Sequence, residues 1–283
     1  MILVDMNQVM ISNMMAQLGN HKNAEVDENM VRHMVLNSLR ANRMKFRDEF
    51  GELVICCDDK NYWRRQLFPY YKASRRKARE GSEIDWNAVF AALNNIRDEL
   101  KEFFPYKVLQ LDSCEADDII GTIVHKEGTL LNTGEPILIL SGDKDYIQLH
   151  TYMNVKQYDP TRKRWITHNN PEQYLTEHVL KGDTGDGVPN VLSPDNCLVV
   201  GERQRPMTKK RIEEFSNINN MNDEVKRNYT RNRMLIDLSQ VPENVKDMIL
   251  EEYAKENTKD RSQLFNYFVN KKLKHLMADL QEF

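Results

Sequence analysis

The sequence predicts an α/β fold with a mostly parallel central sheet flanked by helices, followed by a smaller C-terminal all-α domain. In the first 180 residues, short apolar runs bounded by turn residues alternate with longer segments in which apolar residues recur at helical spacing. Such alternation favours βαβ units, whose sheet is covered by helices on both faces. Beyond this half, apolar residues recur almost only at helical spacing. The pattern therefore divides the chain into residues 1–180 and 181–283.

The expected strands of the first half are short, and two of its helices begin after an aspartate. Asp27 can cap a helix that runs to about residue 46, and Asp85 can cap another that runs to about residue 103. A further helix is predicted over residues 115–126. The expected strands span residues 1–5, 52–57, 106–111 and 136–141, and residues 155–158 and 165–167 are expected to form a hairpin.

The second half is expected to contain helices and no further sheet. Its apolar spacing follows the helical period in five segments, and no Pro-rich or Ser-rich linker marks the boundary near residue 180. The expected helices span residues 171–180, 207–215, 223–236, 244–255 and 260–280.

The composition is that of a globular protein. The 283 residues are 40% hydrophobic and 29% charged, which is enough chain for about two domains of roughly 150 residues. No apolar run approaches the ~20 residues that a membrane helix needs, and the N-terminus lacks the basic and apolar stretches of a secretory signal. The four cysteines form no CxxC pair and are too few for a disulfide framework. We therefore expect a protein of a reducing cytosol with no membrane association.

Positive charge is concentrated in residues 60–79. This segment has eight basic residues and no acid, whereas the rest of the chain has 32 basic and 43 acidic residues. Aromatic residues, among them Tyr62, Trp63 and Tyr71, are interleaved with the cations. Single-stranded nucleic acids are bound by cations that contact phosphates and by rings that stack on bases. The pattern is equally compatible with a solvated basic helix whose aromatic residues are buried.

Acidic residues follow the expected strands at the point where each strand ends. Because the carboxyl ends of parallel strands share one edge of the sheet, these side chains are expected to converge on one crevice. A single acid at such a position is ordinarily a helix cap, but six or more like charges in one crevice cannot all stay ionised without bound cations. The acids after the strands are Asp5, Asp58, Asp112, Glu115, Asp117, Asp118, Asp143 and Asp145, and Asp183 and Asp186 follow in the Gly-rich loop 181–190.

This donor set indicates a metal-dependent chemistry. Oxygen ligands favour Mg²⁺ or Mn²⁺ over Zn²⁺, and the number of carboxylates favours two ions. Two such ions about 3.5 to 4 Å apart stabilise the attacking and leaving oxygens of an in-line displacement at phosphorus. The basic segment begins two residues after Asp58 and would lie beside them, where a phosphate backbone has to be guided. Hydrolysis of phosphodiester bonds is therefore the predicted chemistry.

Six motifs resemble, in order, those of the 5′ nuclease (flap endonuclease) family, and most closely its members in T-even-type bacteriophages. The motifs are LVDMNQ at 3–8, CDD with YWRR at 57–65, YKASR at 71–75, CEADD at 114–118, SGDKD at 141–145 and KGDTGDGVPN at 181–190. The resemblance implies an α/β nuclease domain of the PIN/5′-nuclease type. It also implies hydrolysis of RNA primers or DNA flaps from the 5′ end on duplex DNA during replication, including ribonuclease H activity on RNA–DNA hybrids.

The resemblance further implies which residues hold two Mg²⁺ ions, for which Mn²⁺ can substitute. One ion would be held chiefly by Asp5, Asp58, Glu115, Asp117 and Asp143, and the other by Asp145, Asp183 and Asp186, with Asp118 acting through water. Lys72 and Arg75 match the pair that family members place over the scissile phosphate, and Arg79 would be a third catalytic cation.

The basic segment, about residues 60–82, would form an arch through which a single-stranded 5′ end passes. The side chains of this arch expected to bind nucleic acid are Arg64, Arg65, Tyr71, Arg76 and Lys77. Family members usually follow the acidic loop with a Gly-x-Gly hairpin that joins two helices and grips duplex phosphates. Here residues 191–206 intervene without that hairpin, so the helix-hairpin-helix-like element is modified. Lys209, Lys210 and Arg211 still supply charge at a helix start, which makes residues 181–283 the expected duplex-binding domain.

The partners that the resemblance implies are DNA and RNA–DNA duplexes with 5′ single-stranded ends, the phage single-strand-binding protein and the sliding clamp, in the cytoplasm of an infected bacterium. Two other functions stay open. A non-catalytic junction-binding protein would be expected to have lost at least one motif acid, and a PIN-type single-strand ribonuclease would not need the basic arm or the Gly-rich loop. The seven histidines are assigned surface or core roles, because none pairs with another at metal-ligand spacing.

Overall fold

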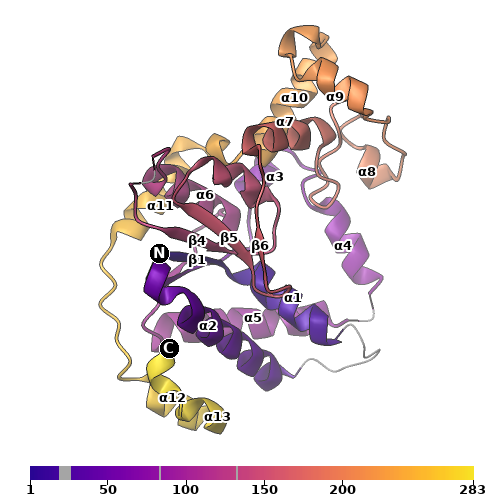
Figure 1. The fold of residues 1–283 in the computed structure, drawn as a ribbon. Helices are drawn as coiled ribbons and strands as arrows, with labels where there is room; N and C mark the ends of the chain where they lie inside the picture. The colour runs from indigo at the N-terminus through magenta and orange to yellow at the C-terminus, as the bar shows by residue number, and fades with distance from the viewer. Residues whose placement is uncertain (19–26, 83, 132) are drawn as a thin grey trace.

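The structure is a computed structural model that describes residues 1–18, 27–82, 84–131 and 133–283, without the side chains of residues 16–18, 76 and 77. Its central element is a six-stranded sheet in the order β3-β2-β1-β4-β5-β6 (Figure 1). Neighbouring strands are parallel except β5 and β6, which form the predicted antiparallel hairpin. The strands are β1 (Ile2–Asp5), β2 (Leu53–Cys56), β3 (Lys107–Leu109), β4 (Ile137–Leu140), β5 (Val155–Asp159) and β6 (Arg164–Ile166). The predicted mostly parallel sheet is confirmed.

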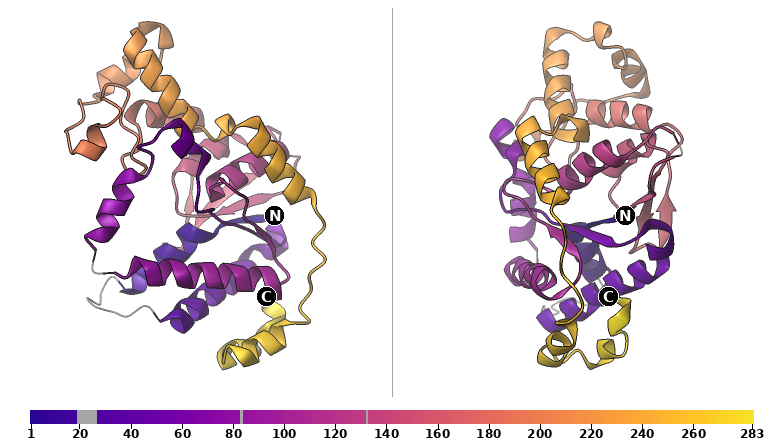
Figure 2. Two further views of the ribbon diagram at one scale, coloured as in Figure 1. Left: turned by 180° about the vertical axis from the view of Figure 1, so that it is seen from behind. Right: turned by 90° about the vertical axis from the view of Figure 1, so that its left-hand side faces the viewer.

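Helices cover both faces of the sheet. Ile2 and Val4 of β1 belong to the core on one face and Leu3 to the core on the other, and all three are fully buried. Burial on both faces explains why the strands are continuous apolar runs without polar alternation. One face is covered by α1 (Met6–Leu18), α2 (Glu28–Phe50) and α5 (Trp86–Phe103), and the other by α6 (Ala116–Glu127) and α11 (Glu243–Ala254) (Figures 1 and 2).

The two aspartates predicted as helix caps both act as caps. The Asp27 carboxylate accepts a hydrogen bond from the backbone N–H of Asn29, at the start of α2. The Asp85 carboxylate accepts two, from the N–H groups of Asn87 and Ala88 at the start of α5. These bonds satisfy backbone donors that have no partner within the first turn of a helix.

The basic segment and the second half of the chain are helical. The segment contains α3 (Trp63–Leu67) and α4 (Ala73–Glu80), and the second half contains α7 (Pro171–Lys181), α8 (Cys197–Val200), α9 (Lys209–Phe215) and α10 (Asp223–Ile236) before α11. Helices α7, α9, α10 and α11 begin within two residues of their predicted starts. Since α11 packs on the sheet, the second half is partly built into the first, and the division at residue 180 stays a prediction. In the described ranges, no helix has the length and apolar character needed to cross a membrane.

The single helix predicted over residues 260–280 is wrong. The chain instead forms α12 (Leu264–Asn270), α13 (Lys274–Met277) and a final 3₁₀ turn, with Lys272 between them at a positive φ of 57°. Leu264, Leu273 and Phe283 are all buried in the core that covers α2 and α5. In one straight helix, Leu273 would face away from Leu264, because nine residues at about 100° each leave them on opposite sides. Breaking the helix lets both side chains enter the same core.

A buried ion-pair network joins this C-terminal segment to the first layer of helices. Arg32 of α2 donates to Glu99 of α5 through Nε at 2.7 Å and Nη2 at 2.8 Å. From α12, Tyr267 OH donates to Glu99 at 2.7 Å. The Lys271 ammonium lies 2.6 Å from the same carboxylate. The single charge of Glu99 on α5 therefore holds side chains from α2 and from the end of α12.

Candidate metal centre

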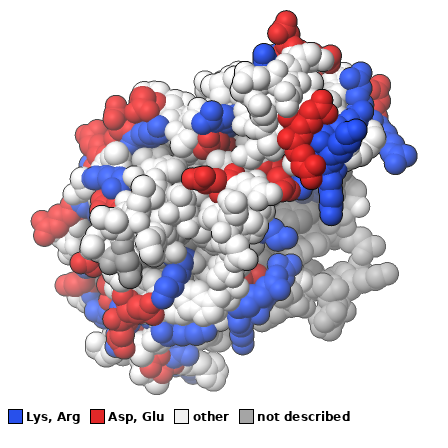
Figure 3. All heavy atoms as spheres, turned by 45° about the horizontal axis from the view of Figure 1, so that its top comes forward, with Lys and Arg blue, Asp and Glu red and all other residues white. Residues whose placement is uncertain are grey.

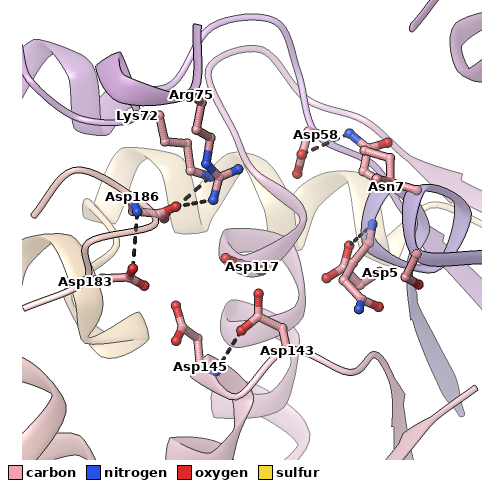
Figure 4. Close-up of a pocket in the computed structure, with 13 residues that line it drawn as sticks. Asp5, Asn7, Asp58, Lys72, Arg75, Asp117, Asp143, Asp145, Asp183 and Asp186 are labelled. Atoms are coloured by element: carbon pink, nitrogen blue, oxygen red, sulfur yellow. Dashed lines mark hydrogen bonds and ion pairs between the residues drawn. The ribbon is translucent and has the colours of Figure 1, made fainter. Parts of the chain in front are cut away.

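A cavity of about 360 Å³ opens at the carboxyl edge of the sheet. Strand β1 lies between β2 and β4, so the order of the strands reverses at this point, which is where open α/β sheets bind ligands. Carboxylates predominate in its lining (Figure 4). The lining residues are Asp5, Asn7, Gln8, Ile11, Ser12, Asp58, Lys72, Arg75, Asp117, Asp143, Asp145, Asp183 and Asp186. Seven of the nine acids predicted as metal ligands are thus brought together.

Asp5 and Asp58 come from the ends of the neighbouring strands β1 and β2. Ser141 Oγ donates to Asp5 Oδ2 at 3.1 Å, and the hydroxyl oxygen of Tyr146 lies 3.2 Å from the same carboxylate oxygen. Asn7 Nδ2, at the start of α1, donates to Asp58 Oδ2 at 2.9 Å. Because each carboxylate is held by donors from other elements, its direction is fixed before any ligand arrives.

Asp117 and Asp143 complete this side of the cavity. Asp117 lies in the first turn of α6, where its Oδ1 accepts a hydrogen bond from Tyr146 OH at 2.6 Å. Asp143 follows β4, and its Oδ1 accepts a hydrogen bond from the backbone N–H of Asp145 at 3.0 Å. Figure 4 shows the carboxylates of Asp5, Asp117, Asp143 and Asp145 around a common space.

The carboxylates on this side repel one another. Burial raises the pKa of Asp5 to about 7, and the charges of Asp58 and Asp143 add to the shift. Burial, followed by the charge of Asp145, raises the pKa of Asp143 to about 6. Burial is also the main cause that raises the pKa of Asp58 and of Asp117. A raised carboxyl pKa means that the anion is destabilised, so keeping this group fully ionised at neutral pH requires cations.

The loop at 181–190 supplies Asp183 and Asp186, and two glycines shape it. Gly182 has a φ of 68°, and a Cβ atom there would lie 2.4 Å from a backbone carbonyl oxygen of the same loop. Gly187 has a φ of 76°, and its Cβ would lie 2.7 Å from the carbonyl oxygen of Tyr70. Only glycine fits these positions without a backbone shift. The glycines therefore allow the acidic loop to lie directly against the basic segment.

Two cations of the basic segment face this loop. The backbone N–H of Lys72 donates to the carbonyl oxygen of Asp186 at 2.7 Å. The Lys72 ammonium contacts Glu115 and lies 3.6 Å from Asp186 Oδ2, and the Arg75 guanidinium pairs with Asp186 (Figure 4). Although burial acts to raise the pKa of Asp186, Lys72 and Arg75 lower it. Asp186 is therefore ionised and neutralised by protein cations, unlike the acids across the cavity.

Glu115 and Asp118 lie behind the cavity and do not line it. Their exposed fractions are 1% and 0%, and both carboxylates lie 2.8 Å from Arg64 Nη1. Glu115 also accepts a hydrogen bond from Tyr71 OH at 3.0 Å. Arg64 and Tyr71 are themselves 2% and 3% exposed. The structure thus places Arg64 and Tyr71, both predicted to contact nucleic acid, in the interior, where they support Glu115.

Three further charged residues singled out in the sequence lie away from the cavity. Arg79 packs its guanidinium over the rings of Phe90 and Trp86 on α5, with centroid distances of 4.7 and 5.6 Å. Arg65 is exposed on α3. Asp112, which follows β3, is exposed and does not line the cavity. The structure therefore separates Arg79 and Asp112 from the acids with which the sequence grouped them.

The remaining predicted contacts with nucleic acid lie on α4 and α9. The side chains of Arg76 and Lys77 fall outside the part of the chain that the structure describes. Lys209, Lys210 and Arg211 form the exposed first turn of α9, which Thr208 caps. On the face drawn in Figure 3, Lys and Arg side chains of the upper part of the molecule lie beside Asp and Glu side chains. The helical part is therefore of mixed charge on this face.

The sequence did not identify four polar residues of the site. Asn7, Gln8 and Ser12 line the cavity. The only sequence signal for Asn7 and Gln8 is that they stand two and three residues after the acid of the first motif. His178, in the last turn of α7, lies 3.1 Å from Asp145 and 3.8 Å from Asp183. Burial acts to lower the pKa of His178, but the adjacent Asp145 and then Asp183 raise it. His178, which the sequence grouped with the other histidines as a surface or core residue, therefore lies beside the acidic cluster.

The residues present fit a centre for divalent cations. The donors are mainly carboxylate oxygens, which hard cations prefer. Burial, followed by the charges of neighbouring acids, raises the pKa of Asp5 and of Asp143, so a cation bound on their side would stabilise both anions. One ligand atom from each of Asp145, His178 and Asp183 also lies within 4.8 Å of the others, a spacing that one ion can bridge.

The sequence matches two family models. The model of the 5′-3′ exonuclease N-terminal resolvase-like domain matches residues 1–180, and that of the T4 RNase H C-terminal domain matches residues 169–283. The chain is 33% identical to ribonuclease H of enterobacteria phage T4, over 99% of this chain and 95% of that protein. It is 32% identical to the flap endonuclease Xni of Shewanella pealeana, over 46% of this chain and 48% of that protein.

Solved structures share the fold. The flap endonuclease of bacteriophage T5, in a complex with DNA and metal ions, superimposes with a TM-score of 0.62 at 16% identity, over 90% of this chain and 99% of that one. A zinc-bound T5 5′-exonuclease superimposes with a TM-score of 0.59 at 17% identity, over 89% and 97%. One family model covers more than half of the sequence, and the phage T4 relative is similar along nearly the whole of it. The chain therefore belongs to the 5′-3′ exonuclease family and is a 5′ nuclease.

Proposed function

We propose that the protein is a Mg²⁺-dependent 5′ nuclease that removes RNA primers or DNA flaps from duplex DNA during replication, and that it hydrolyses the RNA of RNA–DNA hybrids. The observation that carries the proposal is the cavity itself, in which acids at the strand ends face Lys72 and Arg75 across a space open to solvent. A phosphodiester is the substrate class that suits such a site. Its negative charge would be attracted by Lys72 and Arg75 on one side and by cations bound to the acids on the other.

Each set of side chains has its own task in this proposal. The carboxylates of Asp5, Asp58, Asp117 and Asp143 would hold one cation, and those of Asp145 and Asp183 would hold the second. Two Mg²⁺ ions bound there would supply a nucleophilic water and offset the charge that develops on the phosphate. Lys72 and Arg75 would orient the scissile phosphate and stabilise its added negative charge.

The substrate is proposed to cross the cavity between α4 and the acidic loop. Among the described side chains of α4, Arg75 both lines the cavity and is exposed to solvent, so it would meet the incoming strand first. The exposed first turn of α9, with Lys209, Lys210 and Arg211, would contact duplex phosphates. The phage single-strand-binding protein and sliding clamp stay proposed partners. They would bring the enzyme to the 5′ ends on which it acts.

One assay distinguishes the proposal from its alternatives. The protein is incubated with 5′-labelled DNA flaps, RNA-primed duplexes and free single-stranded RNA, with Mg²⁺ or with a chelator. We expect short 5′ products from both duplex substrates, only with Mg²⁺. Binding to the flap without cleavage would instead identify a junction-binding protein, and cleavage of the free RNA alone would identify a single-strand ribonuclease.

Lys72→Ala is expected to lower kcat by about 10²- to 10³-fold while affinity for substrate changes little. A cation over the scissile phosphate gains most as charge develops there, and removal of one such donor costs about 3 to 4 kcal/mol in comparable sites. Single-turnover cleavage and equilibrium binding in Ca²⁺ measure the two quantities separately. The control is Lys60→Ala, an exposed cation of the same basic segment, which should leave kcat unchanged. A Lys72→Ala protein with normal kcat and weakened binding would contradict this role.

A further inference from the structure

The imidazole of His178 lies close to two carboxylates of the cavity, those of Asp145 and Asp183. Its Nε2 atom is buried and lies 3.1 Å from Asp145 Oδ1 and 3.8 Å from Asp183 Oδ2, and among the described residues neither contact has the alignment of a good hydrogen bond. A buried nitrogen without a hydrogen-bond partner is costly and calls for an explanation such as an ion. The His178 nitrogen and the two carboxylate oxygens are close together without the alignment of a hydrogen bond, as is expected of atoms that bind the same metal ion.

The spacing of these atoms agrees with one bound cation. Neighbouring ligands on an octahedral ion with bonds of about 2.1 Å are separated by about 3 Å. The Nε2–Oδ1 distance of 3.1 Å has this value. The three potential ligand atoms, one each from Asp145, His178 and Asp183, all lie within 4.8 Å of one another. The geometry therefore provides three ligands on one side of an ion.

The imidazole is held in place by the fold. Tyr174, one turn earlier on α7, stacks against the His178 ring with a centroid distance of 5.9 Å and an interplanar angle of 24°. The turn at Gly182 then returns the chain, so that Asp183 lies beside the helix end that carries His178. Asp145 approaches from the first residue of the 3₁₀ helix Asp145–Thr151, which follows β4. Three segments thus fix the relative positions of the three ligands.

We infer that His178 is a nitrogen ligand of the cation held by Asp145 and Asp183, and that it makes this position prefer Mn²⁺ over Mg²⁺. The inference rests on the proposed two-cation function and specifies the chemistry of one position. Imidazole binds transition-metal ions well, whereas Mg²⁺ prefers an all-oxygen shell. Asp5, Asp58, Asp117 and Asp143 offer only oxygen. The two positions therefore differ in selectivity, and the second is the one that Mn²⁺ enters first.

The test uses the full-length protein with substoichiometric Mn²⁺ in excess Mg²⁺, so that each Mn²⁺ is magnetically isolated. Electron spin-echo spectra of the wild type are expected to show the nuclear modulation of a directly bound imidazole nitrogen. His178→Gln should lose the modulation, and its preference for Mn²⁺ over Mg²⁺ should fall at least about tenfold, as judged by the usual cost of weakening a metal site. His168→Gln, an exposed histidine beside Tyr174, is the matched control and should behave like the wild type.

The wild-type spectrum decides the question even if His178→Gln does not fold. Bound Mn²⁺ without nitrogen modulation, in a protein that cleaves flaps, would overturn the role of His178 and leave the proposed nuclease function standing. A protein that neither binds Mn²⁺ nor cleaves flaps would overturn both. Modulation that persists in His178→Gln would assign the nitrogen to another residue and also overturn the inference.

Discussion

Replacing Asp143 by asparagine is expected to lower kcat for flap cleavage at least about a thousandfold. Loss of several kcal/mol of metal-derived charge stabilisation corresponds to a factor of this size. The asparagine Oδ1 can still accept the hydrogen bond that the backbone N–H of Asp145 donates to Asp143 at 3.0 Å. The change therefore removes the charge and keeps the local structure. Single-turnover cleavage of a 5′-labelled flap at saturating Mg²⁺ measures the effect.

The stability of the same variant separates a catalytic role from a structural one. Because burial and the charge of Asp145 raise the pKa of Asp143 to about 6, the Asp143 anion destabilises the metal-free fold. Without divalent cations, the Asp143→Asn protein should melt at the same or a higher temperature than the wild type. Asp112→Asn, an exposed acid that also follows a strand, is the control and should retain full activity. Full activity of Asp143→Asn would remove the proposed site.

Replacing Glu99 by glutamine is expected to lower the free energy of unfolding by about 3 to 5 kcal/mol. That is the usual cost of removing one partner of a buried ion pair, because the other charge is left uncompensated. Here the Arg32 side chain is 1% exposed, and Lys271 lies 2.6 Å from the same carboxylate. Urea unfolding followed by circular dichroism measures the difference, with a comparison of midpoints at constant m.

The control for this prediction is Glu28→Gln. Glu28 also pairs with Arg32, but its side chain is 41% exposed, so its loss should cost no more than about 1 kcal/mol. The pH dependence gives a second check. Although burial acts to raise the pKa of Glu99, its hydrogen bonds with Arg32 and Lys271 lower it below the usual value. The charge therefore adds stability above the ordinary glutamate pKa of about 4.3, and this stability is lost as the pH falls through the lower folded pKa.

The difference in stability between the wild type and Glu99→Gln should consequently shrink in acid. A difference that stays constant from neutral pH down to pH about 3 would show that the network contributes through shape and not through charge.

Much of the cavity could be predicted from the sequence, because the rule that places it is local and topological. Asp5, Asp58 and Asp143 each follow an apolar strand, and parallel strands bring their carboxyl ends to one edge. The caps Asp27 and Asp85 were predictable for a similar reason, since a cap acts within its own first turn.

Which acids line the cavity and which are buried behind it could not be predicted in this way. Glu115 and Asp118 belong to the same motif as Asp117, but Arg64, which is 51 residues before Glu115, draws these two into the interior. His178 joins Asp145 across 33 residues because α7 packs against the 3₁₀ helix Asp145–Thr151. Pairings of this kind depend on how separate elements pack, and no periodicity in the sequence records them.

By itself, the sequence determined the alternation of strands and helices, the edge of the sheet at which the acids gather and the basic segment beside them. Each of these follows from spacing along the chain and from the chirality and direction of parallel strands. The tertiary structure alone decided which acids face solvent and which are neutralised by protein cations, and where the last helix breaks. Those outcomes depend on burial, which is a property of the packed molecule. Removing an unpaired charge from water costs free energy, and leaving the Leu273 side chain in water also costs free energy.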